Sequence, residues 1–201
     1  MKKVLLSIVT VFTFGVVSAQ EESTFGFAKG DVFIEGNLGF YSFNDKNSDF
    51  KESEFNFNPK VGYFISEKLA LGAELMYGSE VAKFGGTKVE DFTSFGAGVF
   101  GRYYFLDLGQ RFKTYAEAGL GFASINDKID DIKGSGFGIG AGLGIQYFVT
   151  EKIAINFGLT DILGFSSFKF KDAEAVNEFY GNVNVFNNFF STAQFGLTFK
   201  L

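Results

Sequence analysis

The sequence of 201 residues contains no cysteine, no histidine and no tryptophan, and it has a single proline. Without cysteine, the chain cannot form a disulfide scaffold, a thiolate metal site, a cysteine nucleophile or a lipid anchor attached to cysteine. Without histidine, it lacks the commonest general base and the commonest metal ligand. The net charge of −5 at pH 7 argues against a nucleic-acid partner, because proteins that bind nucleic acids are usually basic. We predict no catalytic, cofactor-binding or metal-binding residue and no cofactor.

Long apolar runs are also missing, except at the N-terminus. Residues 1–3 carry positive charge, residues 4–17 are mostly apolar, and residues 17–19 are of the kind that signal peptidase reads. A membrane-spanning helix needs about 20 apolar residues, which is more than this segment provides. The sequence therefore predicts a secretory signal peptide over residues 1–19 and one exported domain over residues 20–201.

Glycine and phenylalanine, in contrast, are abundant, with 26 and 30 residues respectively. Soluble domains contain on average only about 7% glycine. From Val32 onward, apolar residues recur at every second position, which is the period of a β-strand and not of a helix. The alternation covers eight segments: residues 32–40, 55–63, 69–77, 94–103, 112–122, 137–147, 153–160 and 192–201.

The two faces of these segments differ in charge, and this difference favours a membrane barrel over a soluble sandwich. The apolar faces carry no charged residue. The opposite faces carry seven, namely Glu35, Lys60, Glu74, Arg102, Lys113, Glu117 and Lys200. These opposite faces are otherwise rich in glycine and aromatic residues, unlike the water-facing side of a sandwich. A charge on the lipid-facing side of a barrel costs roughly 2–4 kcal/mol at mid-bilayer, which gives the missing charges a physical cause.

The lengths of the connections predict the topology. Short connections follow the second, fourth and sixth segments, whereas longer ones cover residues 44–53, 78–91, 124–134 and 166–188. Transmembrane barrels have an even number of strands, short periplasmic turns and longer outer loops. We therefore predict an all-β fold, an eight-stranded antiparallel up-and-down transmembrane β-barrel. Ten strands are the alternative, because residues 166–188 are long enough to contain another hairpin.

Aromatic residues mark both ends of the predicted strands. Tyr63, Tyr103 and Tyr147 lie on the apolar face just before the short connections. The opposite ends carry Phe40, Phe55, Tyr77, Phe95, Phe122 and Phe137 on the same face. Two such belts are typical of the two membrane–water interfaces of an outer-membrane barrel.

Two neighbouring segments resemble a known family. Residues 98–105, Gly-Val-Phe-Gly-Arg-Tyr-Tyr-Phe, and residues 115–121, Tyr-Ala-Glu-Ala-Gly-Leu-Gly, resemble the outer-membrane β-barrel family. That family includes the membrane domain of outer-membrane protein A and the small OmpX-type barrels. Residues 195–201 resemble the C-terminal strand read by the barrel-assembly machinery, although Leu201 stands where phenylalanine is usual.

The resemblance implies a location and a set of partners. The location is the outer membrane of a Gram-negative bacterium, with both termini in the periplasm. The partners are the barrel-assembly machinery during insertion and outer-membrane lipids, including lipopolysaccharide. Enzymes among outer-membrane barrels of similar size use an essential histidine, so we predict that this protein is not an enzyme. A serine–lysine or paired-carboxylate site is the formal alternative.

Three inward charges form the candidate site of this sequence. Arg102 is predicted to lie between Glu74 and Glu117 on neighbouring strands, and pairing is expected because a lone buried charge is unfavourable. This lumen charge cluster is predicted to be a structural plug, with a gate as the alternative. The lumen of an eight-stranded barrel is just wide enough for side chains to fill. We therefore predict a monomer with a structural or surface-interaction role; the alternative is a narrow pore for small solutes or ions.

The predicted outer loops are rich in acidic residues. Their acids are Asp45, Asp49, Glu52, Glu54, Asp127, Asp130, Asp131, Asp172, Glu174 and Glu178. A solvated surface is the simpler interpretation, and contact with lipopolysaccharide through bridging cations is the alternative. The last of these loops also contains Phe179, Tyr180 and Val183, which would suit an extracellular partner.

Overall fold

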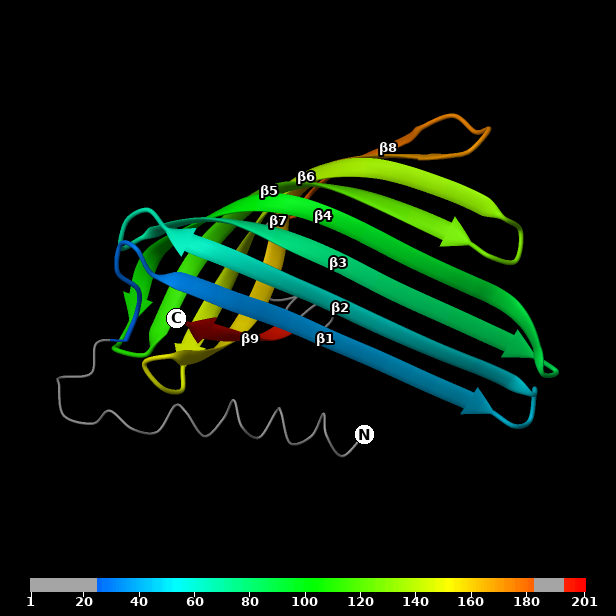
Figure 1. Ribbon diagram of the computed structural model, residues 1–201, viewed down its shortest axis with the longest axis horizontal. Coiled ribbons are helices and arrows are strands. Elements are labelled where there is room, and N and C mark those ends of the chain that lie inside the picture. The colour runs from blue at the N-terminus through cyan, green and yellow to red at the C-terminus, as the bar shows by residue number, and fades with distance from the viewer. Residues whose placement is uncertain (1–24, 183–193) are drawn as a thin grey trace.

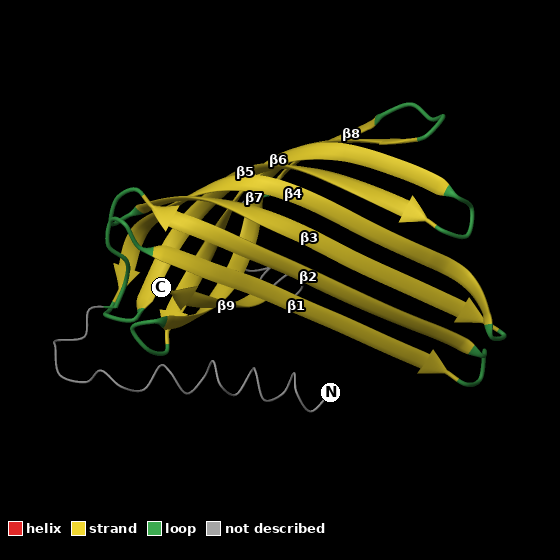
Figure 2. Ribbon diagram, viewed as in Figure 1, coloured by secondary structure: helices red, strands yellow, loops and turns green. Residues whose placement is uncertain are grey.

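The computed structural model describes residues 25–182 and 194–201, which form an antiparallel β-barrel (Figure 1). This part of the chain consists of strands, turns and short irregular segments (Figure 2). No helix within it is long and apolar enough to cross a membrane. The strands are β1 (Val32–Asp45), β2 (Phe50–Phe64), β3 (Leu69–Phe84), β4 (Thr87–Leu108), β5 (Phe112–Asp127), β6 (Ile132–Phe148), β7 (Ile153–Phe170), β8 (Val176–Gly181) and β9 (Gln194–Lys200). The predicted signal peptide, residues 1–19, lies outside the described residues.

Strand pairing confirms the eight-stranded ring. Each strand from β1 to β7 pairs antiparallel with the next, and β9 closes the ring by pairing with both β7 and β1. β8 pairs with residues 163–168 of β7, whereas β9 pairs with residues 153–158 of the same strand. Because β6 occupies the other edge of β7, β8 and β9 follow one another at a single position of the ring. Residues 166–182 thus contain a hairpin turn. Because β8 shares its ring position with β9, this hairpin adds no position to the ring, and the ten-strand alternative is wrong.

The apolar face of each strand points away from the lumen. Val99 in the middle of β4 is 53% exposed, and Leu120 on β5 is 58% exposed. The predicted belt residues Phe95 and Phe137 are exposed to a similar degree. A large apolar surface of this kind is stable only against another apolar phase, which for a closed barrel is the lipid.

Where the sequence suggested long outer loops, the strands continue as hairpins (Figure 1). The first three turns cover only residues 46–49, 85–86 and 128–131, so the prediction of long outer loops is wrong. Beyond the bilayer a strand no longer needs an apolar outward face, so the alternation fades while the backbone ladder persists. Gly85 and Gly86, with φ of 57° and 79°, form the two-residue turn between β3 and β4. Such turns require positive φ at both positions and therefore favour glycine.

Inward glycines make room for aromatic side chains in the narrow lumen. A Cβ atom on Gly144 would lie 2.1 Å from the Tyr115 ring, and one on Gly62 would lie 2.2 Å from Phe33. Neither contact is possible for a larger residue without displacement of the ring. The glycines opposite the apolar faces therefore serve packing, and the aromatic rings that they admit fill the end of the barrel that carries the short turns.

Candidate functional site

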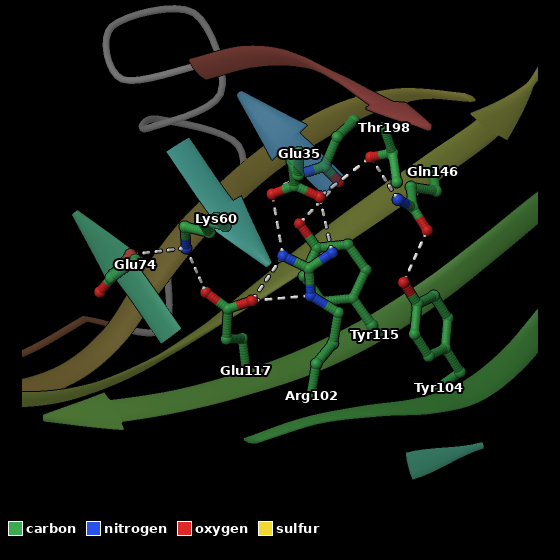
Figure 3. A network of polar contacts seen from close by, with 10 residues as sticks. Glu35, Lys60, Glu74, Arg102, Tyr104, Tyr115, Glu117, Gln146 and Thr198 are labelled. Carbon is green, nitrogen blue, oxygen red and sulfur yellow. Dashed lines mark hydrogen bonds and ion pairs between the residues drawn. The ribbon is translucent and has the colours of Figure 1, made fainter. Parts of the chain in front are cut away.

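A buried ion pair across the lumen is the centre of the site. Arg102 on β4 is 0% exposed, and its two Nη atoms donate to Glu35 on β1 at 2.8 and 3.0 Å. Its Nε atom donates to Glu117 Oε2 on β5 at 2.6 Å (Figure 3). The guanidinium carbon lies 4.3 Å from the centre of the Tyr115 ring. Arg102 is thus held on three sides, by two carboxylates and an aromatic face.

Lys60 extends this centre toward β2 and β3. Its Nζ atom contacts Glu117 Oε1 at 2.6 Å and Glu74 Oε2 at 3.0 Å. Lys60 lies directly opposite Glu74 in the β2–β3 register, and Arg102 lies opposite Glu117 in the β4–β5 register. The two cations and three carboxylates alternate in space, so attraction dominates between nearest neighbours.

Neutral polar groups complete the network on the remaining strands. Glu35 accepts hydrogen bonds from Asn156 Nδ2 at 2.9 Å and from Thr198 Oγ1 at 3.0 Å. Gln146 donates to Thr198 at 2.8 Å and accepts from the Tyr104 hydroxyl at 2.6 Å. The network therefore takes at least one side chain from each of the eight ring strands: Glu35, Lys60, Glu74, Arg102, Glu117, Gln146, Asn156 and Thr198.

An aromatic layer packs beneath the network, at the end with the short turns. Phe27, which precedes β1, stacks on Phe64 with 4.1 Å between ring centres. The same ring lies 5.4 Å from both Tyr104 and Phe148. Lys200 holds this segment in place, because its Nζ atom donates to the Gly26 carbonyl at 3.0 Å and contacts Asp31. The segment before the first strand thus packs across this mouth of the barrel.

Above the network, toward the hairpins, the lumen widens into a cavity of about 630 Å³. Its base is formed by Arg102, Glu74 and Glu117, and its walls include Met76 and Phe168. The cavity and the filled layer below it divide the lumen into two regions.

A second acidic group lies higher on the hairpins. Oxygen atoms of Glu52, Glu54 and Glu80 all lie within 4.8 Å of one another. The pKa of both Glu52 and Glu80 is raised, mainly by the loss of surrounding water and secondly by the negative charge of Glu54. In contrast to the network below, these carboxylates have no ion-pair partner within the described residues.

The predicted cluster residues occur together, although not in the expected pairing. Arg102 contacts Glu117 directly, whereas Glu74 joins only through Lys60. The sequence identifies Glu35 as an inward charge but not as the main partner of Arg102, because the two lie 67 residues apart in the chain. Phe27 was missed entirely, since it precedes the alternating pattern and carries no sequence signal.

The comparisons with known proteins agree with this architecture. Residues 7–199 match the family model of the outer membrane protein beta-barrel domain. The chain belongs to this family. No curated protein matches it in sequence. Membership places the protein in the outer membrane of a Gram-negative bacterium, as the resemblance implied.

Solved structures of small outer-membrane barrels share the fold. The crystal structure of OprG from Pseudomonas aeruginosa is 14% identical, covers 88% of this chain and 98% of its own, and has a TM-score of 0.50. The N-terminal β-barrel domain of OprF from the same species is 18% identical, covers 87% of this chain and 100% of its own, and has a TM-score of 0.47. At such identities the likeness to OprG supports the fold alone.

Proposed function

We propose that this protein is a structural or surface-interaction barrel whose lumen is closed, and that it is not an enzyme. The observation that carries the proposal is the network that includes a side chain from every ring strand. Directly below it, the aromatic layer around Phe27 fills the turn-side mouth. Two consecutive filled layers leave ions no wide path through this half of the barrel.

The energetics of the network support a structural role. Arg102 and Glu35 are almost completely buried, and every charge of the network has an opposite charge within 3.0 Å. Removing one partner of a buried ion pair typically costs about 3–5 kcal/mol, because the other charge is left unpaired. An opening gate would have to break several such contacts together. The geometry therefore favours a plug over a gate.

We infer that the hairpin end faces the cell exterior and that both ends of the domain face the periplasm. Leu201 donates a backbone hydrogen bond to Val32 at the end with the short turns (Figure 1). Periplasmic turns are short in this class of barrel, whereas the outer connections are extended. The β1–β2, β3–β4 and β5–β6 hairpins would then present a surface for an extracellular partner.

Single-channel recording in planar bilayers tests the closed lumen. We expect wild type to show no steady conductance and Arg102→Ala to show more channel events than wild type. Glu80→Gln is the matched control, because it removes a lumen charge above the filled layers. Steady ion conductance by wild type would replace this proposal with its alternative, a narrow pore for small solutes or ions.

A further inference from the structure

A groove lies on the outward face of the barrel, at the outer ends of β3 to β7. One continuous row of directly paired residues crosses it: Tyr77, Phe95, Ser124, Ser135 and Lys169. Directly paired residues of an antiparallel sheet point to the same side. Because Tyr77 and Phe95 are exposed on the outward face, Lys169 projects to that face as well.

The next row outward also combines small polar residues with lysine. It runs through Ser79, Thr93, Asn126 and Lys133. Lys171 follows, because its backbone nitrogen donates to the Lys133 carbonyl. Ser124 and Ser135 in the first row, and Thr93 and Asn126 in the second, are smaller than the aromatic and lysine residues around them, so the surface is concave there. The resulting groove has a volume of about 660 Å³.

One wall of the groove is basic in a protein that is acidic overall. Lys128, Lys133, Lys169 and Lys171 all line it. Lys128 contacts Asp91 at 3.3 Å, whereas the other three have no ion-pair partner within the described residues. The acids of the neighbouring turns are not among the residues that line the groove. The three lysines without an ion-pair partner in the described part of the chain therefore make this wall of the groove electrostatically suited to an anion.

The floor of the groove contains polar atoms without a partner. Thr93 Oγ1 and Asn126 Oδ1 are buried and form no hydrogen bond. Both residues line the groove. Buried polar atoms in proteins are nearly always hydrogen-bonded, so these two are available to bond with hydroxyl or amide groups that enter the groove. This observation is independent of the lysines.

The position of the groove relative to the bilayer identifies the source of the anion. The row on its membrane side contains the belt residues Phe122 and Phe137, which are directly paired and more than half exposed. Aromatic belts of this kind lie at the level of the lipid headgroups. Apolar residues Leu120 and Ile139 continue below the belt and offer a surface for acyl chains. A ligand that fits both parts has a phosphorylated sugar headgroup and several acyl chains.

We propose that this groove binds the phosphorylated headgroup of an outer-leaflet glycolipid of the lipid A type. Lys133, Lys169 and Lys171 contact its phosphates, while Thr93 and Asn126 hydrogen-bond to its sugar hydroxyl or amide groups. The contact is direct and requires no bridging cation, unlike a contact through the acidic residues of the turns. The proposal rests on the inferred outward orientation of the hairpins and is independent of whether the lumen conducts.

Binding of purified lipid A to the full-length mature protein in detergent micelles tests the site. Native mass spectrometry would count the retained lipid, with diphosphorylated lipid A and its fully dephosphorylated form as probes. We expect Lys133→Gln/Lys169→Gln/Lys171→Gln to weaken binding of the diphosphorylated form roughly tenfold or more, because each lysine adds attraction to an anionic surface. Lys46→Gln/Lys51→Gln/Lys83→Gln is the matched control. It removes the same charge from other outer hairpins, and less than about a twofold change is expected for it.

Several outcomes would overturn the proposal. Equal loss in both triple variants would indicate a general charge effect, and equal retention of the dephosphorylated lipid would exclude recognition of phosphate. Competition by millimolar inorganic phosphate would indicate a soluble anion instead of a lipid.

Heat-dependent gel mobility verifies that each variant is folded. If the triple variant does not fold, Lys169→Gln alone replaces it in the binding assay, with a smaller loss of lipid binding expected. Thr93→Val should weaken binding of both lipid forms, since it removes only a headgroup hydrogen bond. Conductance is recorded separately, so a failure here does not affect the closed-lumen proposal.

Discussion

The two halves of the lumen place charges of the same kind in opposite electrostatic arrangements. On the turn side, the β2–β3 register sets Lys60 directly opposite Glu74. Six residues earlier in β2, toward the outer hairpin, the same register sets Glu54 opposite Glu80. Opposite charges across a strand pair stabilise it, whereas like charges destabilise it. An inward position therefore does not define the role of a charged residue; its cross-strand neighbour does.

The difference also separates a rigid region from a weaker one. The turn-side half combines the buried network with the aromatic layer. The hairpin half has the backbone ladder and an acidic group, but no comparable filled layer at the level of the 630 Å³ cavity. Regions with few buried side-chain contacts open most readily, so local unfolding should begin at the hairpins. The four predictions below test this contrast, in order of decreasing effect.

Arg102→Ala should have the largest effect on stability. It leaves Glu35 and Glu117 close together without the guanidinium, and breaking a buried pair from one side typically costs about 3–5 kcal/mol. Urea unfolding in lipid vesicles, followed by circular dichroism, measures the change. Adding Glu35→Gln and Glu117→Gln should restore part of the loss. Unchanged stability in Arg102→Ala would show that the turn-side half does not depend on this network.

Val99→Arg should destabilise the barrel by roughly 2–4 kcal/mol, because this outward residue lies midway between the two aromatic belts. Leu106→Arg is the matched control: it is equally outward and apolar but close to a short turn, where roughly 0–1 kcal/mol is expected. The same unfolding assay compares the two. Equal costs would contradict the assigned depth of the strands in the bilayer.

Phe27→Ala should destabilise the turn-side half by about 1–3 kcal/mol, through the lost packing of a half-buried aromatic ring. Phe27→Leu should restore much of this, because it refills the volume between Phe64 and Phe148. Protease sensitivity of the segment before β1 provides a second measurement. If Phe27→Ala unfolds like wild type, the segment is attached to the mouth of the barrel without stabilising it.

The smallest expected effect is a pH dependence of the hairpin half. The pKa values of Glu52 and Glu80 are raised above 4.5, so their contribution favours the folded state below that value. This contribution is lost as the pH rises through the raised pKa values, because both carboxyls then become charged beside Glu54. Relative to Glu52→Gln/Glu80→Gln, wild type should therefore lose stability as the pH rises above 4.5. Asp130→Asn is the control, and parallel pH profiles for wild type and the double variant would exclude this repulsion.

Individual residues show where prediction from the sequence succeeded and where it stopped. Glu74, Arg102 and Glu117 were recognisable as lumen residues, because alternation alone assigns a side to each position. The partner of Arg102 was not, since Glu35 approaches it across the lumen and not along a neighbouring strand. Alternation does not extend into the outer hairpins, because polar residues occupy both faces there, so the sequence predicts loops in their place. Lys133 and Lys169 likewise became part of one surface only through the register of β5, β6 and β7.

By itself, the sequence determined that this chain forms a membrane β-barrel, whereas strand pairing decided between eight strands and ten. A period of two and a charge-free face are local properties, and the cost of a charge in lipid imposes them on every strand. Only the tertiary structure decided which charges pair, how Phe27 packs across the turn-side mouth, how far the hairpins extend and where the outward lysines gather. These features depend on strand register and ring closure. Ring closure joins segments distant in the chain, and the alternation within one strand does not specify which residues meet across the lumen.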